Sequence, residues 1–152
     1  MFAMRPNSQK GEREAALSQL LASNYGLANR SQLRGLGFTD SSIQRLVSSG
    51  RISRFLPSVF RSTAVPVTWE TRALGGCLRS PGKVWLSHGA AAAHHGFSGC
   101  RKGRLEYLST THLRPVRDQI IHYVAALPAC DIEDLRGIPV TSPARTLLDL
   151  AG

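Results

Sequence analysis

The sequence predicts an α+β fold in two parts that meet near residue 65. In the N-terminal part, apolar side chains recur at the spacing of amphipathic helices, and two strand-like stretches follow. Beyond Pro66, helix-like and strand-like stretches alternate. The composition, 42% hydrophobic and 19% charged over 152 residues, allows a real core. We therefore expect a flexible tail at 1–11, a small helical domain at 12–64 and a mixed α+β domain at 65–152.

The first two helices follow from apolar spacing and from residues that end helices. Apolar residues recur at helical spacing from Glu12 until Asn24-Tyr25-Gly26 ends the run. Leu27-Ala28 is expected to form a short extended segment. A second, short helix opens at Asn29 or Arg30-Ser31, and Gly37 ends it.

A third helix is predicted over Ser41–Ser49. Thr39 and Asp40 are both suitable N-caps, and Gly50 suits the left-handed position that ends a helix. The apolar residues of this helix fall on one side, at Ile43, Leu46 and Val47. The other side carries Ser42, Gln44, Arg45 and Ser48.

A β-hairpin is predicted after the third helix. Ile52 and Val59-Phe60 indicate two short strands, with a turn near Leu56-Pro57-Ser58. Three helices followed by a hairpin, in a short basic segment, are typical of a winged helix-turn-helix. The predicted fold is therefore α+β, with an N-terminal winged helix-turn-helix followed by a small mixed α/β domain.

Residues 66–152 are predicted to be mixed α+β. A helix with a Thr cap and a final helix with Pro143 at its first position are the clearest of them. The predicted elements are a helix at 68–78, a strand at 83–87, a helix at 87–95, strands at 104–109 and 119–124, a helical turn at 131–135 and a helix at 142–151.

Basic residues are concentrated in the N-terminal part. The whole chain carries 19 Lys and Arg against 10 Asp and Glu, a net charge of +9, and 16 of the basic residues are arginine. Residues 1–64 hold nine basic and three acidic residues, or +6, while residues 65–152 hold ten and seven, or +3. This asymmetry favours double-stranded DNA as a partner. The alternative is a winged helix that binds protein, with arginines that are merely solvated.

Candidate DNA-binding residues follow from the expected docking of such a fold. The third helix would enter the major groove, the start of the second helix would meet a phosphate, and the hairpin would lie on the backbone. Arginine suits guanine and glutamine suits adenine, while serine can bond to a base or a phosphate. The candidates are Arg30, Ser31, Gln32, Ser41, Ser42, Gln44, Arg45, Ser48, Arg51, Arg54 and Arg61.

No pattern of catalytic, metal-binding or cofactor-binding residues is found. The acidic residues are scattered, and His88, His94, His95, His112 and His122 have no Asp, Glu or Cys at ligand spacing, so packed or capping histidines are expected. The three cysteines, Cys77, Cys100 and Cys130, lie far apart in the sequence and are expected to be buried. Arg145 and Asp149 are four residues apart, which predicts an ion pair on the last helix.

No stretch predicts a membrane span or a secretory signal, because no apolar run is long enough for a bilayer and the N-terminal residues are polar. We therefore expect a cytoplasmic protein that has no membrane contact, no cofactor and no metal, and that is not an enzyme.

Three segments carry a family resemblance: GLANRSQLRGLGFTDSSIQRLVSSGRISRFLPSVFR, LSHGAAAAHHGF and RGIPVTSPARTLLDLAG. In this order they resemble the AbiEi family of antitoxins from type IV toxin–antitoxin systems. The resemblance implies a DNA-binding domain that represses its own promoter at an inverted repeat, followed by a domain linked to antitoxicity and, indirectly, to a cognate toxin. One departure lies at Leu56-Pro57-Ser58-Val59-Phe60, where the family pattern has a glycine before its last two residues.

A second interpretation comes from relatives that continue into a restriction-like endonuclease fold. The chain would then be the DNA-targeting half of a longer protein, and its second domain would be truncated at the C-terminus. The sequence leaves the oligomeric state open between a monomer and a DNA-induced dimer.

Overall fold

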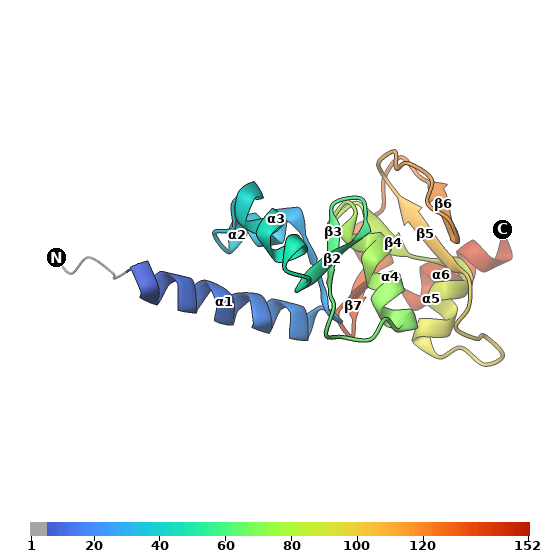
Figure 1. Cartoon of the computed structure of the whole chain (residues 1–152). Helices are drawn as coiled ribbons and strands as arrows, with labels where there is room; N and C mark the ends of the chain where they lie inside the picture. Colours follow the sequence, from blue (N-terminus) through green and yellow to red (C-terminus); the bar gives the residue numbers. More distant parts are fainter. Residues whose placement is uncertain (1–5) are drawn as a thin grey trace. The chain divides into compact units, whose positions relative to one another are not determined.

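The structure is a computed structural model that describes residues 6–152, and it confirms the mixed α+β class (Figure 1). The described residues form six α-helices and two β-sheets. The chain divides into two compact units, Met1–Val67 and Thr68–Gly152. None of the described helices combines the length and apolar character needed to cross a bilayer.

The first unit consists of three helices and a three-stranded antiparallel sheet. Its sheet has the order β1-β3-β2, so the last strand lies in the middle. The elements are α1 (Pro6–Ser23), β1 (Leu27–Asn29), α2 (Arg30–Gly35), α3 (Asp40–Ser48), β2 (Ile52–Leu56) and β3 (Val59–Ser62). In this sheet Arg61 of β3 pairs with Leu27 on one side and with Ser53 on the other.

Helix α1 begins at Pro6, earlier than the sequence predicts. Residues 6–11 are helical and do not form a flexible tail, whereas residues 1–5 lie outside the described part of the chain. Proline is well suited to the first position of a helix, because its fixed φ is already helical and its missing N–H is not needed there. Gln9 and Lys10 are good helix formers and carry the helix on to Glu12.

In the core of the first unit, one apolar face of each helix packs against the sheet. Leu17 of α1, Leu33 of α2, Ile43 and Leu46 of α3 and Phe60 of β3 are all at most 6% exposed. The inner side predicted for the third helix is confirmed, since Val47 also packs against this cluster. The packing therefore decides which side of α3 faces solvent.

The second unit is built on a five-stranded mixed sheet of order β6-β5-β4-β8-β7. Strand β4 is central, antiparallel to β5 and parallel to β8. The elements are α4 (Trp69–Leu78), β4 (Val84–Leu86), α5 (His88–His95), β5 (Leu105–Ser109), β6 (Gln119–Tyr123), the 3-10 turn η1 (Ala129–Asp131), β7 (Ile132–Leu135), β8 (Ile138–Thr141) and α6 (Pro143–Ala151).

The helical turn predicted at 131–135 is wrong, because residues 132–135 are strand β7 of a hairpin with β8 and only Asp131 is helical, as the last residue of η1. Arg136 and Gly137 both have positive φ, 51° and 78°, which suits a two-residue hairpin turn. The N–H of Gly137 donates to Asp134 Oδ1 at 2.9 Å and closes the turn. Pairing with β8 thus overrides the local helical tendency. The exposed position of Cys130 in η1 also contradicts its expected burial.

Helices α4 and α5 cover opposite faces of the second sheet. Tyr107 and Glu106 are neighbours on β5, so their side chains point to opposite faces. Tyr107 contacts Gly76 of α4, whereas Glu106 contacts Gly89 of α5. The fully buried Tyr107 hydroxyl donates to Ala73 O at 3.0 Å.

The close approach of Tyr107 to α4 makes Gly76 intolerant of a side chain. A Cβ at Gly76 would collide with the phenol ring, whose own position is fixed by its hydrogen bonds. We expect Gly76→Ala to lower the free energy of unfolding by about 1–3 kcal/mol, as overpacked cores do. Chemical denaturation measures this. Gly11→Ala, in open space on α1, is the control and should leave stability unchanged or slightly raised. Equal stability of Gly76→Ala and the wild type would contradict the packing described.

Candidate nucleic-acid interface

Helix α3 is fixed at its start by a reciprocal capping box. The N–H of Thr39 donates to Ser42 Oγ at 2.7 Å, and the N–H of Ser42 donates to Thr39 Oγ1 at 3.2 Å. Ser42 was a candidate base reader, but its hydroxyl is engaged in this cap and its side chain is only half exposed. The cap therefore positions α3, and the other polar residues of the helix form its solvent-exposed side.

The solvent side of α3 carries Ser41, Gln44, Arg45 and Ser48, all exposed. Gln44 lies within 3.5 Å of Ser48 Oγ through its Nε2, one turn along the helix. Among the described residues, no carboxylate forms an ion pair with Arg45. One guanidinium, one carboxamide and two hydroxyls thus face solvent from a rigid helix. These are the groups that read base edges in a major groove.

The start of α2 is joined to the start of α3 by one carboxylate. Arg30 Nη1 and Arg34 Nη2 contact Asp40 Oδ1 at 3.0 and 2.9 Å. The hydrogen bond and charge of Arg34, followed by those of Arg30, hold the pKa of Asp40 below its ordinary value of 3.8. The group is well exposed, so this bridge orients the two arginines more than it stabilises the fold.

Of the two further candidates on α2, Gln32 and Ser31, only Gln32 has its side chain engaged in a cap. Gln32 Oε1 accepts the N–H of Asn29 at 2.9 Å, and Asn29 Oδ1 accepts the N–H of Gln32 at 2.7 Å. This second capping box engages the Gln32 carbonyl, as the first engages Ser42. Ser31 is exposed beside it. Arg30 also lies over the ring of Phe60, 5.4 Å from its centroid, which places its head group beside the hairpin.

The hairpin arginines occupy three different environments. Arg54 reaches back to α3, with Nη2 3.5 Å from Gln44 Oε1, and lies 6.0 Å from the Phe60 centroid. Arg51 is paired with Glu14 of α1 at 2.7 Å. Arg61 is half-buried on the central strand. The structure thus brings Arg54 close to the exposed side of α3, and it pairs Arg51, which is also exposed, with a carboxylate of the same unit.

The turn of the hairpin departs from regular pairing. Ser58 has a φ of 62°, a conformation that glycine adopts without cost, and it occupies the position where the family pattern has glycine. The register between β2 and β3 shifts between Arg54 and Leu56. The serine keeps the left-handed turn, so the departure in sequence does not remove the hairpin.

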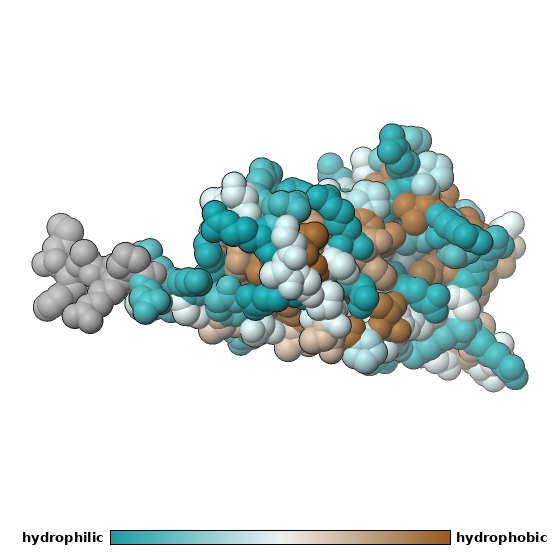
Figure 2. All heavy atoms as spheres, viewed as in Figure 1, coloured by the Kyte–Doolittle hydropathy of each residue, from teal (hydrophilic) through white to brown (hydrophobic). Residues whose placement is uncertain are grey.

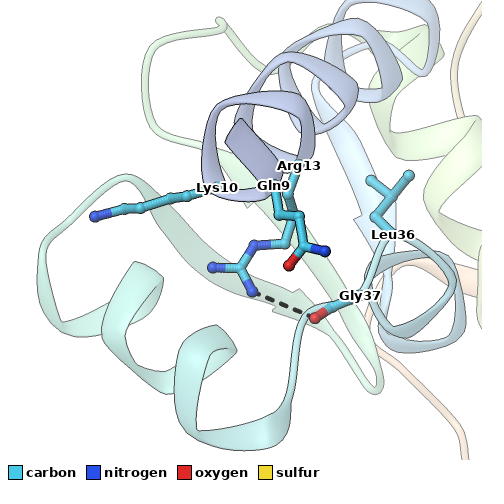
Figure 3. Close-up of a pocket in the computed structure, with 5 residues that line it drawn as sticks. All are labelled: Gln9, Lys10, Arg13, Leu36 and Gly37. Atoms are coloured by element: carbon cyan, nitrogen blue, oxygen red, sulfur yellow. Dashed lines mark hydrogen bonds between the residues drawn. The ribbon is translucent and has the colours of Figure 1, made fainter. Parts of the chain in front are cut away.

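Helix α1 adds two cations that the sequence did not predict as site residues. Arg13 points toward the loop before α3, donates to Gly37 O at 3.3 Å and lies 4.5 Å from the centroid of Phe38 (Figure 3). Lys10, three residues earlier, is exposed. Both line a hollow that Arg45 and Arg51 also line. Lys10 and Arg13 are three residues apart, so they lie on one side of a helix, and this spacing could have identified them from the sequence. The signal is lost when residues 1–11 are assigned to a tail.

The surface over α2 and α3 is mostly hydrophilic in the view of Figure 2. A hollow beside the hairpin is lined by Arg30 and Arg54 together with residues 55–60. Cationic groups therefore lie on α1, α2, α3 and the hairpin, around the exposed polar side of α3. Such an arrangement can bind a phosphate backbone on either side of a helix that reads bases.

Comparison with known proteins gives one family match. The family model described as AbiEi antitoxin C-terminal domain matches residues 14–152. No curated protein matches the chain. The matched range includes residues 14–67 of the first unit, the whole second unit and all three sequence segments that carry the resemblance.

The bridge from Asp40 to Arg30 and Arg34 predicts how the pKa of Asp40 changes when each arginine is replaced. Because the pKa of Asp40 is lowered in the folded protein, its stabilising effect is present above pH 3.8 and is lost as the pH falls below that value. In Arg34→Gln the pKa should rise toward 3.8, and in Arg30→Gln it should rise less. Carboxyl ¹³C NMR titration measures both, with Arg45→Gln as the charge-matched control. An unchanged Asp40 titration in Arg34→Gln would contradict the bridge.

Proposed function

The chain belongs to the AbiEi antitoxin family, and from this premise we propose that it is a DNA-binding regulator that represses its own promoter. In this proposal it is the antitoxin of a type IV toxin–antitoxin system. Residues 12–64 act as a winged helix-turn-helix, with α3 in the major groove and the β2–β3 hairpin as the wing. The effect comes from occupying the operator, without catalysis.

The exposed side of α3 is the observation that carries the proposal. Its Gln44 and Arg45 are exposed, while Ile43 and Leu46 on the other side are 2% and 6% exposed. A helix used only for packing against another protein would favour apolar groups at its exposed centre, as interface cores do. A carboxamide beside a guanidinium that forms no ion pair within residues 6–152 instead suits adenine and guanine edges.

The cations around α3 supply the second part of the interface. In the proposal, Arg30 and Ser31 at the start of α2 and Arg51, Arg54 and Arg61 on the hairpin contact phosphates. Lys10 and Arg13 of α1 extend the same set. Phosphate contacts fix the orientation of the protein on the duplex, and base contacts then select the sequence. The net charge of +6 over residues 1–64 supports the phosphate contacts.

The proposed operator is an inverted repeat in the promoter region of the protein's own gene. Two copies would pair on such a site, one per half-site, with α3 of each copy in successive major grooves. The chain would be a monomer or would dimerise on the DNA, in the cytoplasm. Its effect on the cognate toxin would be indirect, through transcription.

The dependence of binding on salt tests the proposal directly. If the cations contact about five phosphates, log K should fall with log salt concentration with a slope of about −4 to −5. Fluorescence anisotropy with the upstream duplex, measured over a series of salt concentrations, gives this slope. A random duplex of equal length provides the non-specific reference. A flat salt response, or no binding at low salt, would refute the proposal.

Two arginine variants separate base reading from backbone contact. Arg45→Ala should weaken binding to the operator by about 1–3 kcal/mol and binding to random DNA much less. Arg54→Ala should weaken both about equally and reduce the salt slope by about one unit. Thermal melts should stay near wild type, because both side chains are exposed.

The control for this pair is Arg117→Ala, an exposed arginine in the second compact unit. It removes the same charge outside the proposed interface and should change neither affinity by a comparable amount. If Arg45→Ala leaves the ratio of operator to random affinity unchanged, α3 is not the element that reads sequence.

A further inference from the structure

Three side chains that could hold a metal ion meet in the second unit: His88, Glu106 and His122. His88 is the first residue of α5, Glu106 lies on β5 and His122 lies on β6. One potential ligand atom from each of them lies within 4.8 Å of the other two. His122 Nε2 and Glu106 Oε2 are 3.1 Å apart.

The topology of the sheet explains why distant residues converge here. Strands β5 and β6 are parallel, with Glu106 paired with Ile120 and Leu108 paired with His122. Because side chains two apart share a face of a sheet, Glu106 and His122 point to the same side. This is the face that α5 covers, as shown by the contact between Gly89 and Glu106. No carboxylate lies close to His88 in the sequence, but the sheet brings that of Glu106 next to it.

The ring of His88 is held for ligation. Its Nδ1 lies 2.9 Å from the hydroxyl of Ser87, a fully buried residue, and no hydrogen bond to Nε2 is formed within residues 6–152. Metal-bound histidines typically have the second ring nitrogen fixed in this way. The His88 backbone is also strained, with a φ of 51°. Its ring stacks on that of His122, with centroids 3.9 Å apart.

Charged groups of both signs surround His88: Glu106 and Asp149 on one side of the balance, and Arg145 on the other. Burial, and then the neighbouring His122, lower the pKa of His88. Asp149 of α6 acts on it in the opposite direction. The Asp149 side chain is only 9% exposed, its Oδ1 bonds to Arg145, and its Oδ2 is buried without a hydrogen-bond partner among the described residues. A buried carboxylate oxygen without a hydrogen bond retains the capacity to accept one more contact, even though the charge of Asp149 is paired with Arg145.

We propose that His88, Glu106 and His122 form a binding site for a divalent transition-metal ion, with Asp149 as the anion behind it. Two imidazoles and one carboxylate are ligands of Zn²⁺ and of its neighbours in the first transition row, whereas Mg²⁺ and Ca²⁺ prefer oxygen ligands only. His122 and Glu106 remain partly exposed, so water can complete the coordination. Ion binding would require the two rings to unstack and tilt, because the nitrogen lone pairs of nearly parallel stacked imidazoles do not meet at one point. The site joins LSHGAAAAHHGF and TLLDLAG, two segments that DNA binding does not explain.

The test is metal titration of the full chain, freed of any affinity tag and treated with a chelator. Calorimetry with Zn²⁺ should give one ion per chain, Co²⁺ should produce visible d–d absorption, and Mg²⁺ should not bind at the same site. Ser87→Ala should weaken Zn²⁺ binding by about 10–100-fold, as loss of an outer partner does, and His122→Ala or Glu106→Gln by more. Far-UV circular dichroism verifies that each variant is folded.

Two control variants separate this site from other ligands on the surface. His112→Ala removes an exposed histidine outside the cluster, and Cys130→Ser removes the exposed thiol, so both should keep the wild-type affinity. Histidine NMR of the wild type, which needs no variant, should show Zn²⁺ shifting His88 and His122 and not His94. No saturable binding at millimolar Zn²⁺, unchanged affinity in both His122→Ala and Glu106→Gln, or loss of binding in Cys130→Ser would overturn the proposal.

Discussion

Strand β3 is paired with β1 on one side and β2 on the other, and the arrangement of the first unit depends on this double pairing. Strand β1 runs directly into α2, and the N–H of Arg30 donates to Ser58 O at 2.9 Å across the sheet. The start of α2 and the tip of the hairpin are therefore fixed by the same backbone. Phe60, in the middle of β3, is buried with its ring close to both Arg30 and Arg54. A change in the register of β3 would move both groups of arginines relative to α3.

In the second unit, buried polar contacts tie helices α5 and α6 to the β7–β8 hairpin. The adjacent His94 and His95 each bond through Nε2 to a backbone oxygen of the β7–β8 hairpin, at Leu135 and Thr141, both at 2.8 Å. Thr141 and Thr146 share a buried hydroxyl contact of 2.7 Å that joins β8 to α6. Burial lowers the pKa of His94, in keeping with a neutral ring that serves packing. The expected ion pair of Arg145 with Asp149 is confirmed at 2.9 Å and extends to Asp131.

Local signals were enough to predict most helices and the exposed side of α3, because caps, apolar spacing and end-forming glycines are encoded within a few residues. The Thr39 cap and Gly50 are examples. Strand β7 could not be predicted in this way, since its pairing with β8 decides its conformation. The cluster of His88, Glu106 and His122 was missed for the same reason: its members come from three elements that only the sheet brings together. The engagement of Ser42 and Gln32 in capping boxes also requires the positions of their partners.

The bridge from Asp40 to Arg30 and Arg34 has a consequence for the entropy of binding. Its carboxylate presents two oxygens to the guanidinium groups much as a phosphate would. The long arginine side chains are thereby already restricted in the free protein, in an orientation that faces outward beside α3. If a DNA phosphate takes over these contacts, the arginines exchange one anion for another and lose little further rotamer freedom. Asp40 would then act as an internal counterion whose displacement contributes to the discrimination between DNA and weaker polyanions.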